Sequence, residues 1–147
     1  MPVDVVTEVV IGRPRQQVAA YAADPGHAPD WYVNIDSVDW RTPPPLRVGS
    51  RVAFVARFLG RRLEYTYEIV VFDPGRELVM RTAEGPFPME TTYSWKDSPQ
   101  GTTMTLRNRG EPSGFAKFGS LAMAAAMRRA NRKDLARLKS LLEGAQS

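Results

Sequence analysis

The sequence closes with a predicted helix of 29 residues, Phe115–Glu143, which limits the folds open to the chain. Its apolar residues recur at helical spacing and form one stripe, which comprises Met123, Met127, Leu135, Leu138 and Leu142. Strand-like segments fill most of the preceding sequence. A single amphipathic helix after so many antiparallel strands has to bury its stripe against a sheet that curves around it. We therefore expect an α+β protein with a hollow between the sheet and the helix.

The excess of basic side chains lies on the same helix. Phe115–Glu143 contains seven Lys or Arg against two Asp or Glu, whereas residues 1–114 contain 13 basic and 14 acidic side chains. The basic residues that lie off the apolar stripe are Arg128, Arg129, Arg132, Lys133, Arg137 and Lys139. This distribution is typical of a solvated helix face, and an acidic membrane or protein partner is the alternative. We do not expect nucleic acid as a partner.

Composition narrows the class of protein. The length of 147 residues and the ordinary share of hydrophobic residues, 43%, predict one domain over residues 1–147. No apolar run approaches the length of a transmembrane segment, and no signal peptide is visible, so we expect a cytoplasmic protein. The absence of cysteine excludes disulfides, thiolate zinc sites and a cysteine nucleophile.

Residue alternation and turn residues predict the order of the elements. Two short helices are expected early in the chain, one that begins at Pro14 and one over Ala28–Tyr32. Strands are predicted over Val3–Ile11, Asn34–Arg41, Glu77–Ala83, Met89–Lys96 and Thr102–Arg109, with two further strands on either side of Gly60-Arg61. The order is one strand, two short helices, six more strands and the long helix.

The central hairpin allows a prediction of register. With Gly60-Arg61 as a two-residue type II′ turn, Phe58 lies opposite Leu63 and Arg57 lies opposite Glu64. One face is then apolar or aromatic, and the other carries opposite charges, with Arg51 on a diagonal to Glu68.

This order of elements resembles the helix-grip fold of the SRPBCC superfamily, which includes START, polyketide cyclase/dehydrase and birch-pollen-allergen-like proteins. The markers are Pro14, the Asp24-Pro25…Trp31 stretch, Val48-Gly49-Ser50-Arg51 and Asp73-Pro74. The resemblance implies a curved seven-stranded antiparallel sheet around the C-terminal helix, with an apolar cavity between them. Members bind lipids, sterols, polyketides or plant hormones, and a minority catalyse cyclisation or dehydration. No catalytic set is shared by the superfamily, so the resemblance transfers none.

The inward faces of the predicted strands and helix supply a candidate cavity wall. Its aromatic and thioether side chains are Phe54, Phe58, Tyr65, Tyr67, Tyr93, Trp95, Met80, Met89, Met104, Met123 and Met127, and Trp31 and Asn108 complete the set. A plain filled core is the alternative. Three inward tyrosines favour a cavity, because each buried phenol needs a hydrogen-bond partner that a ligand or water can supply.

Catalytic machinery is sparse. His27 is the only histidine, and a surface loop position without function is the simpler interpretation of it. The sequence contains no metal-ligand spacing, no nucleotide-binding loop and no Gly-x-Ser-x-Gly elbow, so we expect no metal and no cofactor. A cofactor-independent enzyme would use Tyr65, Tyr67, Tyr93 or Asn108 for proton transfer, with the carboxylates of Glu84 and Glu90 as further candidates.

Three functions therefore stay open at this point. The sequence favours binding, with transport as an extension, of a small hydrophobic ligand such as a lipid or a polyketide-like molecule. A polyketide cyclase/dehydratase-type enzyme and a basic-helix interaction module are the alternatives. The chain is expected to be a monomer or a homodimer, and an exposed Trp40, Phe72 or Phe87 would supply a dimer patch.

Overall fold

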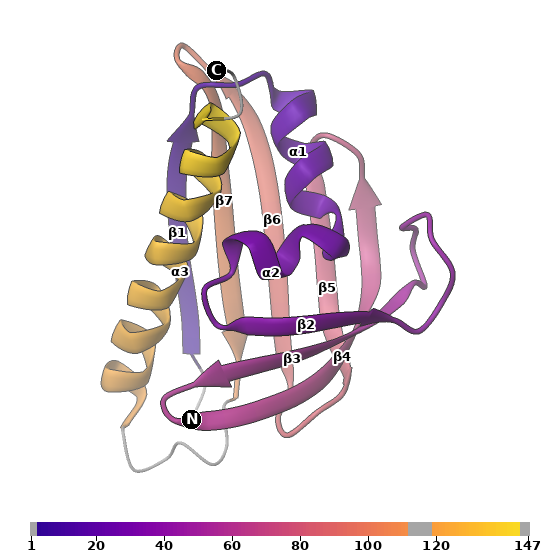
Figure 1. The fold of residues 1–147 in the computed structure, drawn as a ribbon. Helices are drawn as coiled ribbons and strands as arrows, with labels where there is room; N and C mark the ends of the chain where they lie inside the picture. The colour runs from indigo at the N-terminus through magenta and orange to yellow at the C-terminus, as the bar shows by residue number, and fades with distance from the viewer. Residues whose placement is uncertain (1–2, 112–118, 145–147) are drawn as a thin grey trace.

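The structure, a computed structural model, describes residues 3–111 and 119–144 (Figure 1). In these ranges the elements are β1 (Val3–Ile11), α1 (Arg15–Ala23), the 3-10 helix η1 (Pro25–His27), α2 (Ala28–Trp31), β2 (Ile35–Trp40), β3 (Arg51–Phe58), β4 (Arg61–Asp73), β5 (Glu77–Glu84), β6 (Met89–Ser98), β7 (Gly101–Gly110) and α3 (Gly119–Gly144). The strands form one antiparallel sheet in the order β1-β7-β6-β5-β4-β3-β2. The predicted order of elements is confirmed, and the start predicted for the last helix, Phe115, lies outside the described residues.

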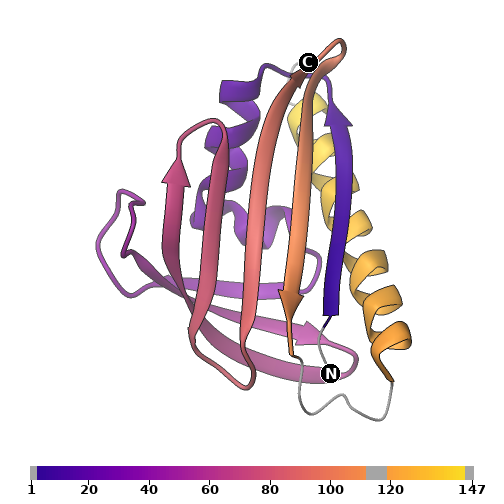
Figure 2. The same ribbon diagram turned by 180° about the vertical axis from the view of Figure 1, so that it is seen from behind.

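The sheet is strongly curved. Strands β2 and β3 run across the view in Figure 1, whereas β1, β5, β6 and β7 run along it, and Figure 2 shows the same bend from behind. The register shifts twice between β4 and β5, at Thr66/Tyr67 and at Ile69/Val71, and once between β2 and β3. Such bulges bend a strand and increase its local twist, so they give the sheet a concave face.

All the described helices lie on the concave face (Figures 1 and 2). The long helix α3 lies along β1, α1 lies against β6 and β7, and α2 contacts β2 and α3. The predicted stripe of α3 is confirmed, because its five residues are no more than 7% exposed: Met123, Met127, Leu135, Leu138 and Leu142. The Nε of Arg13 also donates to the carbonyl of Leu142 at 2.9 Å, which ties the end of α3 to the loop after β1.

The β3–β4 register differs from the prediction by two residues. Phe58 lies opposite Arg61 rather than Leu63, and Phe54 lies opposite Tyr65. The turn residues are therefore Leu59 and Gly60, with φ of 51° and 80°, as a type I′ turn requires. A shift of two residues moves no side chain to the other face, so the apolar and charged faces are as predicted.

The ion pairs on the outer face of the sheet also differ from the predicted ones. Glu64 lies opposite Val55 rather than Arg57. Arg57 lies opposite Arg62 and forms an ion pair of 2.9 Å with Asp36 of β2 instead. Arg51 lies directly opposite Glu68, and their side chains are joined by an ion pair of 2.9 Å.

The aromatic residues considered for a dimer patch pack locally. Phe72 contacts the main core cluster, Phe87 packs with Met123 and Met127, and Trp40 packs with the cluster around Phe54. None of these three side chains is fully exposed. Within the described ranges, no helix combines the length and apolar character needed to span a bilayer.

Candidate ligand-binding cavity

A cavity of about 170 Å³ lies between the concave face of the sheet and α3. An engineered apolar protein cavity of about 150 Å³ admits benzene, so this space is large enough for a small organic molecule. Most of its lining is apolar or aromatic, and the lining side chains come from α1, α2, α3 and strands β2 to β7. The cavity is therefore a product of the whole fold rather than of one local motif.

Most of the side chains predicted to line a cavity do so. The structure brings together Phe54, Phe58, Tyr65, Tyr67, Met80, Met89, Tyr93, Asn108, Met123 and Met127. The Pro86–Phe87 segment of the β5–β6 loop also contributes to the wall. Asn108 lines the interior and accepts a hydrogen bond from the Thr91 hydroxyl.

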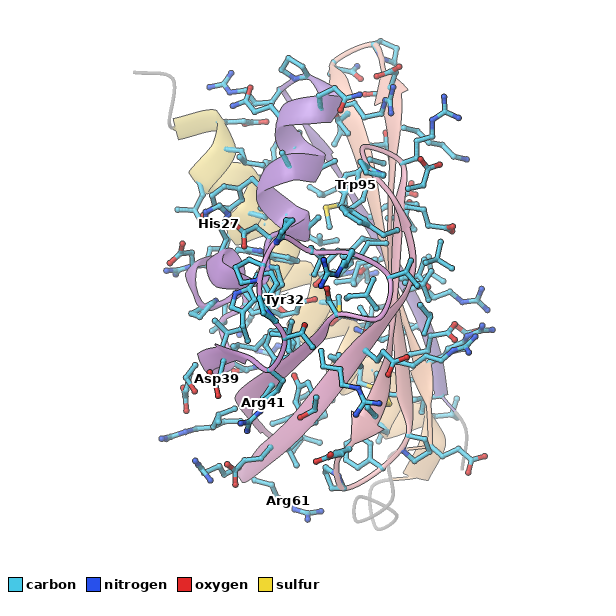
Figure 3. The ribbon with its side chains drawn as sticks, turned by 90° about the vertical axis from the view of Figure 1, so that its right-hand side faces the viewer. His27, Tyr32, Asp39, Arg41, Arg61 and Trp95 are labelled. Carbon is cyan, nitrogen blue, oxygen red and sulfur yellow. The ribbon has the colours of Figure 1, made fainter. Side chains whose placement is uncertain are left out.

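Trp31, Trp95 and Met104 were also predicted to line the cavity, but they lie in the filled core. Each is no more than 2% exposed and belongs to the cluster that includes Leu138 and Leu142. Figure 3 shows Trp95 nearer than Tyr32 to the end of the molecule that holds α1. Strand alternation predicted the correct face for Trp95 and Met104, but this end of the face is covered closely by helices.

One hydrogen-bonded group crosses the sheet side of the cavity. The Thr91 hydroxyl donates to Oδ1 of Asn108 at 2.6 Å, and the Tyr67 hydroxyl lies 3.1 Å from the same Thr91 oxygen. Because the Thr91 proton is used toward Asn108, the Tyr67 hydroxyl is the donor in the second bond. We call Tyr67, Thr91 and Asn108 the sheet-wall chain, and both of its hydroxyl groups have hydrogen-bond partners within it.

A second polar group lies against α3, and we call it the α3 polar cluster. Its members are Tyr32, Tyr65, Tyr93, Asn131 and Asp134, and all of them line the cavity. The hydroxyls of Tyr32 and Tyr93 are hydrogen bonded to each other. Asp134 is 3% exposed and accepts a hydrogen bond of 2.9 Å from the backbone N–H of Val33. The cluster thus joins the sheet, the segment after α2 and the long helix.

Sequence analysis missed Tyr32, Asn131 and Asp134 as members of the site. A signal for the last two was present in the helical spacing. Asn131 lies four residues after Met127, and Asp134 lies seven residues after Met127. Both positions therefore fall on the apolar stripe of α3. Polar residues that interrupt a buried stripe face the interior, and an interior with room for them suggests a cavity.

Burial changes the acid–base behaviour of this cluster. It raises the pKa of Asp134 to about 6, against an ordinary value of 3.8, and the hydrogen bond from Val33 opposes the rise. Burial also raises the pKa of Tyr32 and of Tyr65 well above 10, with neighbouring phenols and the Asp134 charge as further causes. Near neutral pH the phenols are therefore protonated donors, whereas most Asp134 carboxyls are ionised acceptors.

His27 does not line the cavity. Its ring stacks on Tyr21 with centroids 4.0 Å apart, and its Nδ1 lies 3.0 Å from the carbonyl oxygen of Tyr21. Figure 3 shows His27 on the outer side of the molecule relative to Tyr32. These contacts give His27 a local structural role in the loop before α2.

The basic face of α3 has two parts. Arg137 donates to the carbonyl of Asp30, and Lys139 pairs with Glu143 at 2.7 Å. In the described part of the chain, no carboxylate lies within ion-pair distance of the remaining cations of this face, which are Arg128, Arg129, Arg132 and Lys133. Arg129, Arg132 and Lys133 are exposed to solvent, as predicted for a solvated helix face.

The curved sheet, the long terminal helix and the cavity between them define a helix-grip protein of the SRPBCC superfamily. Residues 2–143 match the sequence profile of the family described as "Polyketide cyclase / dehydrase and lipid transport", and the chain belongs to this family. No curated protein matches the sequence significantly.

Solved structures with the same fold cover nearly the whole chain. A protein of Thermus thermophilus, TTHA0849, is 20% identical with a TM-score of 0.82, over 98% of this chain and 99% of that one. The Zhui aromatase/cyclase of Streptomyces sp. R1128 is 16% identical with a TM-score of 0.80, over 97% and 94%. Major latex-like protein 151 of Panax ginseng is 16% identical with a TM-score of 0.69, over 92% and 96%. At these identities the likeness is one of fold.

Proposed function

We propose that this protein binds a small, largely apolar molecule in the cavity between the sheet and α3. The observation that carries the proposal is the cavity of about 170 Å³ itself, whose wall is mainly aromatic and aliphatic. Concave apolar sites with a few polar groups are the usual form of small-molecule sites. The family description, which names lipid transport and polyketide chemistry, supports a ligand of this class. The cytoplasmic location expected from the sequence stays a prediction.

A substitution that fills the cavity tests this proposal. Ala56 of β3 lines the cavity and is 7% exposed, whereas Ala53 of the same strand lies on the opposite face. Naphthalene, whose fluorescence reports its environment, serves as an apolar probe. We expect the unmodified protein to bind it, and Ala56→Phe to weaken binding at least tenfold by occupying the space. Ala53→Phe is the matched control and should retain the affinity of the unmodified protein.

Circular dichroism of both variants shows whether they are folded. Native mass spectrometry of the purified protein adds a readout without a probe, because a co-purified apolar molecule adds to the mass of the folded chain. Equal naphthalene affinity of Ala56→Phe and the unmodified protein would place binding outside the cavity. A complete lack of naphthalene binding would refute the proposal directly.

An enzyme of the polyketide cyclase/dehydratase type is the second candidate function. The observation that favours it is Asp134, whose carboxyl has a pKa of about 6 in a cavity with protonated phenols. A carboxylate of this pKa is suited to accept a proton from a carbon beside a carbonyl group. The Tyr65 hydroxyl would then donate a hydrogen bond to the enolate oxygen that forms.

A turnover assay distinguishes the binding function from the enzymatic function. For an enzyme, Asp134→Asn should abolish conversion of a poly-β-ketone substrate analogue and leave its binding intact. Tyr67→Phe in the sheet-wall chain serves as the comparison, since that hydroxyl already has a protein partner. No turnover by the unmodified protein would leave binding alone as the function.

A further inference from the structure

We propose that the α3 polar cluster is a subsite for a hydroxyl group, so that the ligand is an apolar molecule with an alcohol or phenol at one end. This inference rests on the proposed function, because it assigns the chemistry of one end of the same cavity. It goes further by stating which part of the ligand faces α3. The argument depends on hydrogen-bonding groups that the protein itself leaves without partners.

The first of these groups is the amide of Asn131. The residue is 5% exposed and lines the cavity, and its Nδ2 is buried with no hydrogen-bond partner among the described residues. The amide oxygen also has no protein hydrogen bond there, so rotation of the amide breaks no existing bond. A buried amide without partners is rare and unfavourable, and a ligand can satisfy it.

The second group is the carboxyl of Asp134, one helical turn further along α3. Its Oδ1 accepts the N–H of Val33, and Oδ2 has no partner within the residues that the structure describes. With a pKa of about 6, this carboxyl is mainly an acceptor at pH 7.5. Its charge contributes to the raised pKa of Tyr32, Tyr65 and Tyr93, and no cation of the described residues forms an ion pair with it.

The third group is the hydroxyl of Tyr65, which also has no hydrogen-bond partner in the described ranges. By contrast, Tyr32 and Tyr93 bond to each other, and Tyr67 bonds to Thr91. The cluster thus offers unused donors at Asn131 and Tyr65 and an unused acceptor at Asp134.

A hydroxyl group is the ligand group that matches this combination. Its oxygen accepts from the Asn131 amide or the Tyr65 phenol, and its proton is donated to Asp134. A carboxylate ligand would be repelled by Asp134, and a ketone would leave the carboxylate without a donor. An ammonium group would satisfy Asp134 but accepts no hydrogen bond from Asn131 or Tyr65.

The rest of the cavity is suited to the apolar part of such a molecule. Met123 and Met127 precede the polar residues on α3, and with Leu63 they form an apolar cluster. Phe58 and Phe87 pack against this cluster and line the cavity as well. The ligand would therefore lie with its hydroxyl toward Asn131 and Asp134 and its apolar body toward these methionines.

Four probes with one aromatic skeleton test the assignment at pH 7.5: naphthalene, 2-naphthol, 2-naphthoate and 2-naphthylmethylamine. We expect 2-naphthol to bind about tenfold more tightly than naphthalene, as one or two hydrogen bonds to a buried carboxylate and amide would provide. We expect 2-naphthoate to bind more weakly than naphthalene. Tighter binding of 2-naphthylmethylamine than of 2-naphthol would overturn the assignment of a hydroxyl group.

Two variants test whether Asn131 causes the preference for 2-naphthol over naphthalene. Asn131→Leu keeps the size of the side chain and removes its amide, so the preference for 2-naphthol over naphthalene should fall about tenfold. Thr103→Val on the outer face of β7 is the control, because Thr103 does not line the cavity and its loss should keep the preference. If Asn131→Leu does not fold, the ¹⁵N side-chain resonance of Asn131 in the unmodified protein should shift with 2-naphthol more than with naphthalene.

The outcomes separate this inference from the proposed function. If the protein binds naphthalene but has no preference for 2-naphthol, the subsite is refuted and the binding function stands. The same conclusion follows if Asn131→Leu folds and keeps the preference. If none of the four probes binds, the proposed function fails, and the subsite fails with it.

Discussion

Replacing Asp134 by asparagine should make the protein more stable at pH 8, and by a smaller amount at pH 5. The carboxyl is 3% exposed and has no basic partner among the described residues, so its negative charge is removed from water without a compensating positive charge. Asparagine has nearly the same size, carries no charge, and retains an oxygen that can accept the N–H of Val33. The substitution therefore removes the charge and preserves the contact.

The expected magnitude follows from the pKa of about 6 in the folded protein and the ordinary value of 3.8. Since the folded pKa is raised, the folded state binds the proton more tightly than the unfolded state. The stability from this group is complete below pH 3.8 and is lost as the pH rises through 6. The loss at pH 8 is about 3 kcal/mol at 1.36 kcal/mol per pKa unit, and about half of it has occurred at pH 5.

Urea denaturation at pH 5 and pH 8 measures both values. Asp134→Asn should exceed the unmodified protein in unfolding free energy by up to about 3 kcal/mol at pH 8 and by about half of that gain at pH 5. Asp39→Asn is the control, because this side chain is exposed on β2 and points away from the cavity (Figure 3), and it should change little at either pH. A gain that does not depend on pH, or no gain at pH 8, would refute the reasoning.

Further predictions concern the turn, a close contact and the basic helix. Leu59→Asn should stabilise the protein by about 0.5–1 kcal/mol in denaturation experiments, because asparagine adopts the positive φ of this turn position more readily; a loss of stability would contradict the assigned turn. Gly110→Ala should destabilise by about 1–3 kcal/mol, since its Cβ would lie 2.3 Å from the Pro88 carbonyl oxygen, whereas Gly144→Ala meets no atom within 4 Å and should change little; equal effects would count against this packing. The double variant Arg129→Glu/Arg132→Glu should keep naphthalene affinity and change stability by less than about 1 kcal/mol, because both side chains are exposed and form no ion pair with the described residues; lost affinity would show that the basic face takes part in binding.

The sequence was sufficient to predict the topology and the inward faces of the strands. Alternation of side chains has a period of two, so the inward positions of β6, such as Tyr93 and Trp95, followed without knowledge of the fold. The same period explains the error in the hairpin. Turns at Leu59-Gly60 and at Gly60-Arg61 place the same residues inward, and alternation cannot distinguish them.

The division of the interior into filled core and cavity was not predictable from alternation. Trp95 and Tyr93 point to the same side of β6, yet only Tyr93 borders the cavity. The difference depends on where α1 and the last turns of α3 press against the sheet, which is a property of tertiary packing. For Asn131 the information was present, because a polar residue within a buried helical stripe marks an interior position.

The pairing of β1 with β7 has a consequence for biosynthesis. Residues about a hundred positions apart meet in this pair, as in the hydrogen bond from the Thr7 hydroxyl to the Leu106 carbonyl. The helix α3 forms its wall of the cavity beside β1, although about a hundred residues are translated between the two elements. Contacts at such separations are slow to form because a long loop has to close first. Nascent chains that stop before α3 should therefore lack a binding chamber, however well their strands have assembled.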